Sequence, residues 1–324
     1  MLPSWSKFSA EDPLHGRAVE QLVLGVSTRG YERSLEPLPP SVRGRGASKS
    51  AVSRRFVRAT SERLDAMLGR RLEDVDLVVL MIDGIHVADH VVLVALGIDA
   101  AGRKHVLGLR EGATENAVSC RALLTDLVQR GLRTERSTFV VLDGAKALRK
   151  AVHDVFGERA IVQRCQVHKT RNVQEQVPDT KRASVRSAMN EAYRTRDAAR
   201  AKKLLENLAR RLEADHPSAA ASLREGLDET LSVLAFHLPA PLERTLATTN
   251  PIENLMSACR RITRNVKRWR GGSMVVRWIA TSLLEASRGF RRLRGYAGMP
   301  QLVAALRARD ARPGSPLDAT AATA

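Results

Sequence analysis

The sequence predicts a mixed α/β fold in which a sheet is flanked by long helical segments. Apolar runs of strand length, either β-branched or alternating, are concentrated in residues 73–165. They occur there in the order β-β-β-α-β-α-β, which predicts three antiparallel strands followed by parallel crossovers. The residues on both sides show the 3.6-residue apolar spacing of helices instead.

The first segment, residues 1–72, is predicted to be a helical and basic DNA-binding segment. Apolar residues indicate one helical segment around 22–24 and another over 52–68, and the stretches 18–26, 27–35 and 48–64 together resemble a helix-turn-helix. Ser48 would cap a recognition helix over the last stretch, although a Pro-rich and Gly/Arg-rich loop precedes it. The candidate DNA contacts on that helix are Lys49, Arg54, Arg55 and Arg58. The alternative is a helical spacer that touches only phosphates.

The second segment, residues 73–165, carries the predicted sheet. The expected strands are residues 75–82, 90–98, 104–109, 138–142 and 160–163, with helices at 116–130 and 145–155. The third segment, 166–245, is helical throughout and is punctuated by prolines. The fourth, 246–310, is helical and strongly basic, and the small polar residues 311–324 are expected to form a flexible tail.

Charge and composition indicate an intracellular protein that binds nucleic acid. The 324 residues include 53 Lys and Arg against 35 Asp and Glu, which leaves a net charge of +18. Such an excess of positive charge favours binding to a polyanion over the alternative that the charges only keep the protein in solution. The sequence contains no apolar run long enough to span a bilayer and no recognisable signal peptide, and its three scattered cysteines fit no disulfide framework. We therefore expect a cytoplasmic, nucleoid-associated protein.

Three carboxylates are candidates for a site that handles phosphates. Asp83 and Asp143 each follow an apolar run that predicts a strand, and each precedes a glycine. Acids at the carboxyl ends of strands point into the crevice where α/β sheets bind ligands, although Asp-Gly also begins ordinary turns. Glu253 lies in the first turn of a predicted helix, with Asn250 as its cap and Pro251 at its first position. Glu253 could instead serve only to balance the helix dipole.

The segment after Glu253 is basic enough to contact DNA. Its candidate contacts are Arg260, Arg261, Arg264, Lys267 and Arg268, with Trp269 available to stack on a splayed base. A solvated basic face is the alternative for the cations, and a core position is the alternative for Trp269.

Several motifs together resemble the bacterial insertion-sequence transposases of the Mutator type. The stretches that carry the resemblance are Asp83-Gly84-Ile85, Asp143-Gly144-Ala145-Lys146, 163–173 with Cys165-x-x-His168, 248–253, and Asn265-Val266-Lys267-Arg268-Trp269. They cover most of the chain. Family members generally begin with a longer DNA-binding region, so the resemblance implies that an upstream portion is lacking here.

The resemblance implies a ribonuclease H-like fold with an all-helical insertion and a catalytic triad of Asp83, Asp143 and Glu253. These residues would hold two Mg²⁺ or Mn²⁺ ions, which prefer oxygen ligands. The implied reaction is metal-dependent cleavage and strand transfer at insertion-sequence ends. The implied partners are terminal inverted repeats, target DNA and further copies of the chain. A catalytically impaired remnant that binds the same DNA as a repressor, or a structure-specific nuclease, would share most of these features.

Two pairs of metal-binding residue types remain outside the triad. Cys165 and His168 have half of a zinc-finger spacing, but no second pair follows at the required distance. We expect them to act as a structural or DNA-positioning signature near the crevice, with metal binding as the alternative. His86 and His90 adjoin strand-like sequence, where a spacing of four does not place two side chains together as on a helix.

Overall fold

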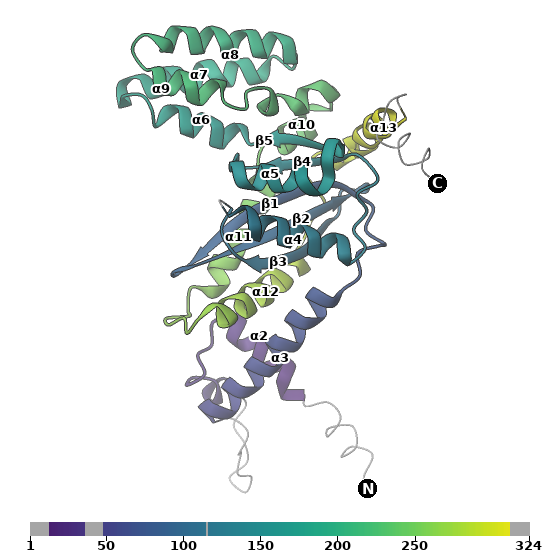
Figure 1. The fold of residues 1–324 in the computed structure, drawn as a ribbon. Helices are drawn as coiled ribbons and strands as arrows, with labels where there is room; N and C mark the ends of the chain where they lie inside the picture. Colours follow the sequence, from purple (N-terminus) through teal and green to yellow (C-terminus); the bar gives the residue numbers. More distant parts are fainter. Residues whose placement is uncertain (1–12, 36–47, 115, 312–324) are drawn as a thin grey trace, which may run out of the picture. The chain divides into compact units, whose positions relative to one another are not determined.

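The computed structural model describes residues 13–35, 48–114 and 116–311 of the chain (Figure 1). The described residues divide into two compact units. The first unit draws on residues 1–70, 87–90 and 255–288, and the second on 71–86, 91–254 and 289–324. This division follows spatial contacts, and the four segments expected from composition stay a prediction.

The second unit contains a five-stranded mixed sheet, as the sequence predicts. Its strands are β1 (Leu77–Val87), β2 (His90–Asp99), β3 (Lys104–Glu111), β4 (Thr138–Leu142) and β5 (Ala160–Arg164). They lie side by side in the order β3-β2-β1-β4-β5. β2 and β3 are antiparallel, whereas β4 runs parallel to both β1 and β5. The two crossovers into the parallel strands are helices, which is the connection that parallel pairing requires.

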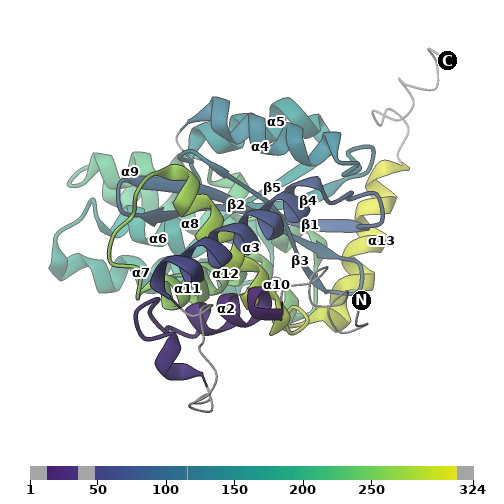
Figure 2. The same cartoon turned by 90° about the horizontal axis from the view of Figure 1, so that it is seen from below.

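Helices α4 (Ala117–Gln129) and α5 (Lys146–Phe156) pack together against one face of this sheet (Figure 2). Alternate strand residues such as Leu80 and its register partner Val140 join their core. Because side chains alternate along a strand, the next residues point to the opposite face. There Phe139 meets Phe236 edge to face, with ring centroids 5.6 Å apart.

A run of helices follows β5 in the chain. It comprises α6 (Gln166–Gln174), α7 (Asp179–Arg194), α8 (Ala198–Glu213), α9 (Pro217–Arg224), η3 (Asp228–Thr230), η4 (Ser232–Phe236) and α10 (Ala240–Leu246). Buried polar groups tie these helices to the sheet. The Gln163 amide donates to the Thr230 carbonyl and accepts from the Val233 N–H. The buried ammonium of Lys169 donates to two carbonyls at the end of α9, those of Ser222 and Glu225.

Three helices complete the described chain, namely α11 (Asn250–Thr263), α12 (Gly272–Arg288) and α13 (Met299–Asp310), with a short η5 (Tyr296–Gly298) before the last. The backbone N–H of Ser137 donates to the Asp310 carboxylate, which fixes the end of α13 at the start of β4. Among the described helices, none has the length and apolarity that a bilayer span needs.

The first unit is helical and contains α2 (Pro13–Val23), η1 (Glu32–Ser34), α3 (Lys49–Gly69) and α12. Its core includes Phe56 and Trp278, whose ring centroids lie 4.6 Å apart. The Ser48 hydroxyl accepts from the Ala51 N–H and caps α3, as predicted. Turns and the single 3₁₀ turn of η1 occupy residues 27–35. The Pro-rich and Gly/Arg-rich loop at 36–47 lies outside the described residues.

Two further boundaries differ from prediction. β1 does not end at Asp83 but continues to Val87, because apolar residues such as Ile85 keep alternating with polar ones beyond the Asp-Gly pair. α11 ends at Thr263, so the basic residues from Arg264 onward lie in a turn and a connecting segment rather than on a helix. The predicted flexible tail is outside the description from residue 312.

Candidate active site

Asp83 and Asp143 occupy equivalent positions on neighbouring strands. Met81 of β1 is in register with Val141 of β4, and each Asp follows two residues later. Two residues along a strand return to the same face, so both carboxylates project from the face opposite α4 and α5. Both are half-buried. The strand pairing therefore places two acids side by side toward the carboxyl ends of the central strands.

Each Asp is held by its own backbone turn. An Asp83 oxygen accepts from the Gly84 N–H at 2.8 Å, and an Asp143 oxygen accepts from the Ala145 N–H at 3.0 Å. Gly144 has a φ of +111°, and a Cβ there would meet the guanidinium of Arg164, so only glycine fits this turn. Burial, together with the charges of Asp143 and Glu253, raises the pKa of Asp83 to about 6, against the lowering effects of the Gly84 N–H and His168.

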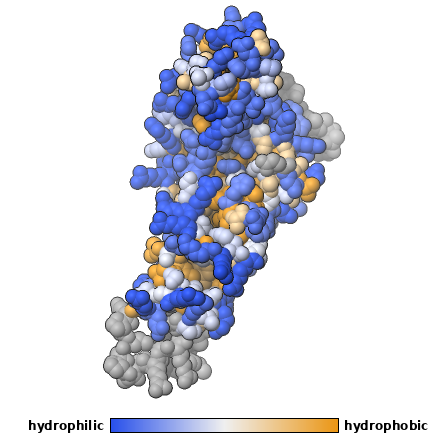
Figure 3. Space-filling model, turned by 90° about the vertical axis from the view of Figure 1, so that its left-hand side faces the viewer, coloured by the Kyte–Doolittle hydropathy of each residue, from blue (hydrophilic) through white to orange (hydrophobic). Residues whose placement is uncertain are grey.

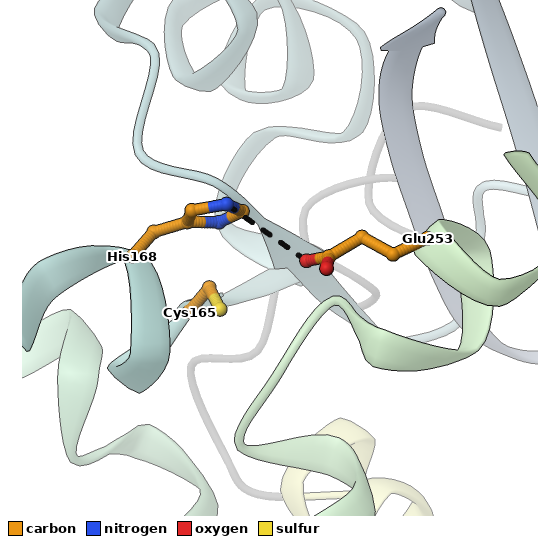
Figure 4. Close-up of side chains that lie close together, drawn as sticks. All are labelled: Cys165, His168 and Glu253. Atoms are coloured by element: carbon orange, nitrogen blue, oxygen red, sulfur yellow. Dashed lines mark ion pairs between the residues drawn. The ribbon is translucent and has the colours of Figure 1, made fainter. Parts of the chain in front are cut away.

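Glu253, in the first turn of α11, lies next to His168 and Cys165 at the start of α6 (Figure 4). Glu253 Oε1 is 3.8 Å from His168 Nε2, and the imidazole and the carboxylate point toward one another. The ligand atoms of these three residues lie within 4.8 Å of one another, and this is the one such group of three found in the part of the chain that the structure describes. His86 and His90 do not belong to it.

Thr249 connects all three of these side chains. Its hydroxyl donates to Glu253 Oε1, lies 3.3 Å from Cys165 Sγ and is 3.4 Å from His168 Nδ1. Its backbone N–H also points to Cys165 Sγ, at 3.5 Å. The Thr249 carbonyl accepts the N–H of Glu253, so Thr249 takes the capping position predicted for Asn250. The sequence argument missed Thr249, although its position four residues before Glu253 was the signal that could have found it.

The Cys165 and His168 pair is polarised. Burial acts to raise the pKa of the Cys165 thiol, but hydrogen bonds with His168 and Thr249 outweigh it and the pKa lies below its usual value. The same hydrogen bond to Cys165 raises the pKa of His168, and the charges of Glu253 and Asp143 add to this effect against burial. The hydrogen bond between the two side chains therefore lowers the pKa of the thiol and raises that of the imidazole.

The basic residues predicted to contact DNA lie in the first unit. On α3, Lys49, Arg54 and Arg58 are exposed and Arg55 is half-buried. Arg58 forms an exposed ion pair with Glu62 at 2.9 Å. The second group is also exposed, with Arg260 and Arg261 in the last turn of α11 and Arg264, Lys267 and Arg268 after it. Most of these side chains are therefore accessible at the surface of the first unit.

Trp269 packs, half-buried, against the hydrophobic core of the first unit. This is the core alternative that the sequence left open for Trp269, rather than a free platform for a base. The three cysteines, Cys120, Cys165 and Cys259, are all buried and form no disulfide.

Comparison with known proteins shows one family. The model of the family "Transposase, Mutator family" matches residues 9–292. The transposase for insertion sequence element IS6120 of Mycolicibacterium smegmatis is 31% identical over 290 residues, which cover 88% of this chain and 86% of that protein. The transposase for IS905 of Lactococcus lactis is 27% identical over 289 residues, covering 87% of this chain and 70% of that one. The transposase for IST2 of Acidithiobacillus ferrooxidans is 31% identical over 175 residues, covering 54% and 58%.

Proposed function

The chain belongs to the Mutator family of transposases, and we propose that it cleaves insertion-sequence ends and transfers the strands with Asp83, Asp143 and Glu253 as its catalytic residues. One observation carries the proposal: three acids, from β1, the end of β4 and the start of α11, gather closely enough that the charges of Asp143 and Glu253 raise the pKa of Asp83. Acids gathered in this way repel each other unless a cation or a proton neutralises them.

The donor set fits divalent cations such as Mg²⁺ or Mn²⁺. All three side chains offer carboxylate oxygens, which hard cations prefer. The pKa of Asp83, raised to about 6, marks a negative charge that burial and neighbouring acids make costly. When bound, two such ions would supply activation of the attacking oxygen and stabilisation of charge on the leaving oxygen.

The strand arrangement supports a ribonuclease H-like fold for this site. The antiparallel strands β1 to β3 are followed by two parallel crossovers, which gives the order β3-β2-β1-β4-β5. The helices α6 to α10 lie in the chain between β5 and the Glu253 helix, where the family pattern implies an all-helical insertion.

The residues around Glu253 would orient it for this work. The Thr249 hydroxyl donates to one carboxylate oxygen, and His168 faces the same oxygen. Cys165 in turn is hydrogen-bonded with both Thr249 and His168. In our proposal Cys165 and His168 hold this geometry, whereas the oxygen ligands come from the three acids.

The substrates we propose are double-stranded DNA with terminal inverted repeats and a target duplex, bound by more than one copy of the chain.

Asp83→Asn, Asp143→Asn and Glu253→Gln should each abolish Mg²⁺-dependent nicking of DNA that carries the element's ends, with binding retained. Glu285→Gln on α12 is a matched control that should cleave normally. Full activity in any of the three variants would remove that residue from the site.

The same assay separates the alternatives. A catalytically impaired remnant would bind the ends without nicking them in Mg²⁺ or Mn²⁺. A structure-specific nuclease would cut branched DNA whether or not the end sequence is present.

A further inference from the structure

Two adjoining hollows of the second unit gather basic side chains. The first, about 490 Å³ in volume, lies between α6, α7 and α10. The second, about 450 Å³, lies between α10, the start of α11 and residues that precede α13. They share Arg244 and Thr248. The cations that line them, which we call the arginine track, are Arg171, Arg186, Arg194, Arg244, Lys104 and Arg294.

The arginine track lacks the balancing acids found at other concave surfaces. Within the described chain, neither hollow is lined by an Asp or Glu, and none of its arginines forms an ion pair. By contrast, Arg182 on the same helix as Arg186 pairs with Asp179 at 2.7 Å. Arg186 and Arg194 also border a neighbouring hollow that contains Asp179 and Glu191, but neither arginine forms an ion pair with a described acid.

The local structure explains how the cations come together. Arg186, Asn190 and Arg194 are four residues apart on α7, so they share one face of that helix. Arg171 projects from α6 toward the same hollow, beside the amides of Gln166 and Gln174. Figure 3 shows that hydrophilic side chains cover most of these helices, at the top of the view. Unpaired like charges on such a face cost stability, which suggests that they serve an anionic ligand.

The arginine track is built from chain neighbours of the candidate active site. Gln166 and Val167, which lie between Cys165 and His168, line the first hollow. Thr248, Asn250 and Asn254, which flank Thr249 and Glu253, line the second. The arginine track is therefore a basic surface whose lining includes the chain neighbours of Cys165, His168, Thr249 and Glu253.

We propose that the arginine track binds the backbone phosphates of the DNA strand that leads into the active site. This inference rests on the proposed function, because it takes Glu253 as the place of cleavage. The guanidinium fork matches a phosphate with two parallel hydrogen bonds, and the amides of Asn190 and Asn254 beside it add neutral donors. None of these groups reads a base by itself, so the track adds affinity and register rather than sequence preference.

The test compares the salt dependence of binding for two double variants of the full chain. The first, Arg171→Gln with Arg186→Gln, removes two track cations. The matched control, Arg182→Gln with Arg224→Gln, removes two exposed cations that are ion-paired with Asp179 and Glu213. The probe is a 30-base-pair duplex of arbitrary sequence, titrated from low to high salt. Thermal unfolding of each variant verifies folding.

We expect the track variant to lower the slope of log K against log salt by about 0.9 for each lost contact, or about 1.8 in all. The control should leave the slope within the error of the wild type. Equal slopes in the two variants would overturn the proposal. An unchanged slope combined with a changed oligomeric state in sedimentation would also overturn the proposal. The arginine track would then be a surface that contacts another copy of the chain. Binding is measured here without cleavage, so equal salt slopes would overturn the arginine track alone. Full nicking activity in the carboxylate variants would instead contradict the proposed catalytic residues.

Discussion

Asp83 and Asp143 stand side by side because Met81 and Val141, two residues before them, are paired in the parallel ladder of β1 and β4. The pairing holds two acids on one face of a rigid sheet, with Glu253 completing the group. Removing the repulsion should therefore have a measurable effect on stability in the absence of metal.

Asp83→Asn should stabilise the metal-free protein at pH 7. The pKa of Asp83 rises from 3.8 to about 6 in the folded state, so the folded protein binds a proton more tightly than the unfolded chain. The wild type should thus lose stability as pH rises from about 4 to 6, by about 1–3 kcal/mol. Urea unfolding at pH 4 and pH 7, with EDTA, measures this. The advantage of the variant should appear at pH 7 and shrink at pH 4.

Mg²⁺ should stabilise the wild-type protein, whereas rising pH destabilises the metal-free form. It should raise the unfolding midpoint of the wild type, because a ligand that binds only the folded state stabilises it by mass action. The same addition should have little effect on Asp83→Asn. An equal shift in both proteins would contradict a metal site that includes Asp83.

Thr249→Val should reduce the cleavage rate constant by about tenfold to a hundredfold, because it removes a hydrogen bond to a charged group that fixes Glu253. Thr249→Ser keeps the hydroxyl and should restore most of the rate. Single-turnover cleavage at saturating DNA separates this effect from binding. A rate in Thr249→Ser as low as in Thr249→Val would indicate that the methyl group matters rather than the hydroxyl.

Purified wild-type protein should contain no stoichiometric zinc. Although Cys165, His168 and Glu253 have the donor types and proximity for it, the Thr249 hydroxyl already lies among them. Elemental analysis after incubation with ZnSO₄ checks this, with Cys120→Ser as the control for a buried thiol elsewhere. One tightly held zinc per chain, lost in Cys165→Ser and in His168→Ala but kept in the control, would make the pair metal ligands. Cys165→Ser and His168→Ala should each reduce cleavage.

Neutralising the exposed cations of α3 should weaken DNA binding. The triple variant Lys49→Gln, Arg54→Gln and Arg58→Gln should lower the salt slope by up to about 2.7 on duplex DNA. Substitution is preferable to deleting residues 1–72, because Phe56 and its neighbours form the core with Trp278. A matched triple on α8, with Lys203, Arg210 and Arg211 changed to Gln, controls for net charge. Similar slopes in both triples would show that α3 has no special role.

The sequence by itself determined the strands, their order and most helices. The run at 138–142 predicted both ends of β4, and β2 and β3 begin where their apolar runs begin. These features follow from local periodicity and turn residues, which a single sequence displays directly. Asp83, Asp143 and Glu253 became candidates in the same way, from their positions beside predicted strands and a helix start.

Only the tertiary structure decided what surrounds Glu253 and where the unpaired cations gather. The contacts of Thr249 with Cys165 link positions 84 residues apart in the chain. The arginine track draws on residues from β3 to the segment before α13. Such groupings depend on how helices and strands pack, and no local spacing encodes them. The length of β1 beyond Asp83 was not predicted, because the Asp-Gly pair within its alternating pattern also suits a turn.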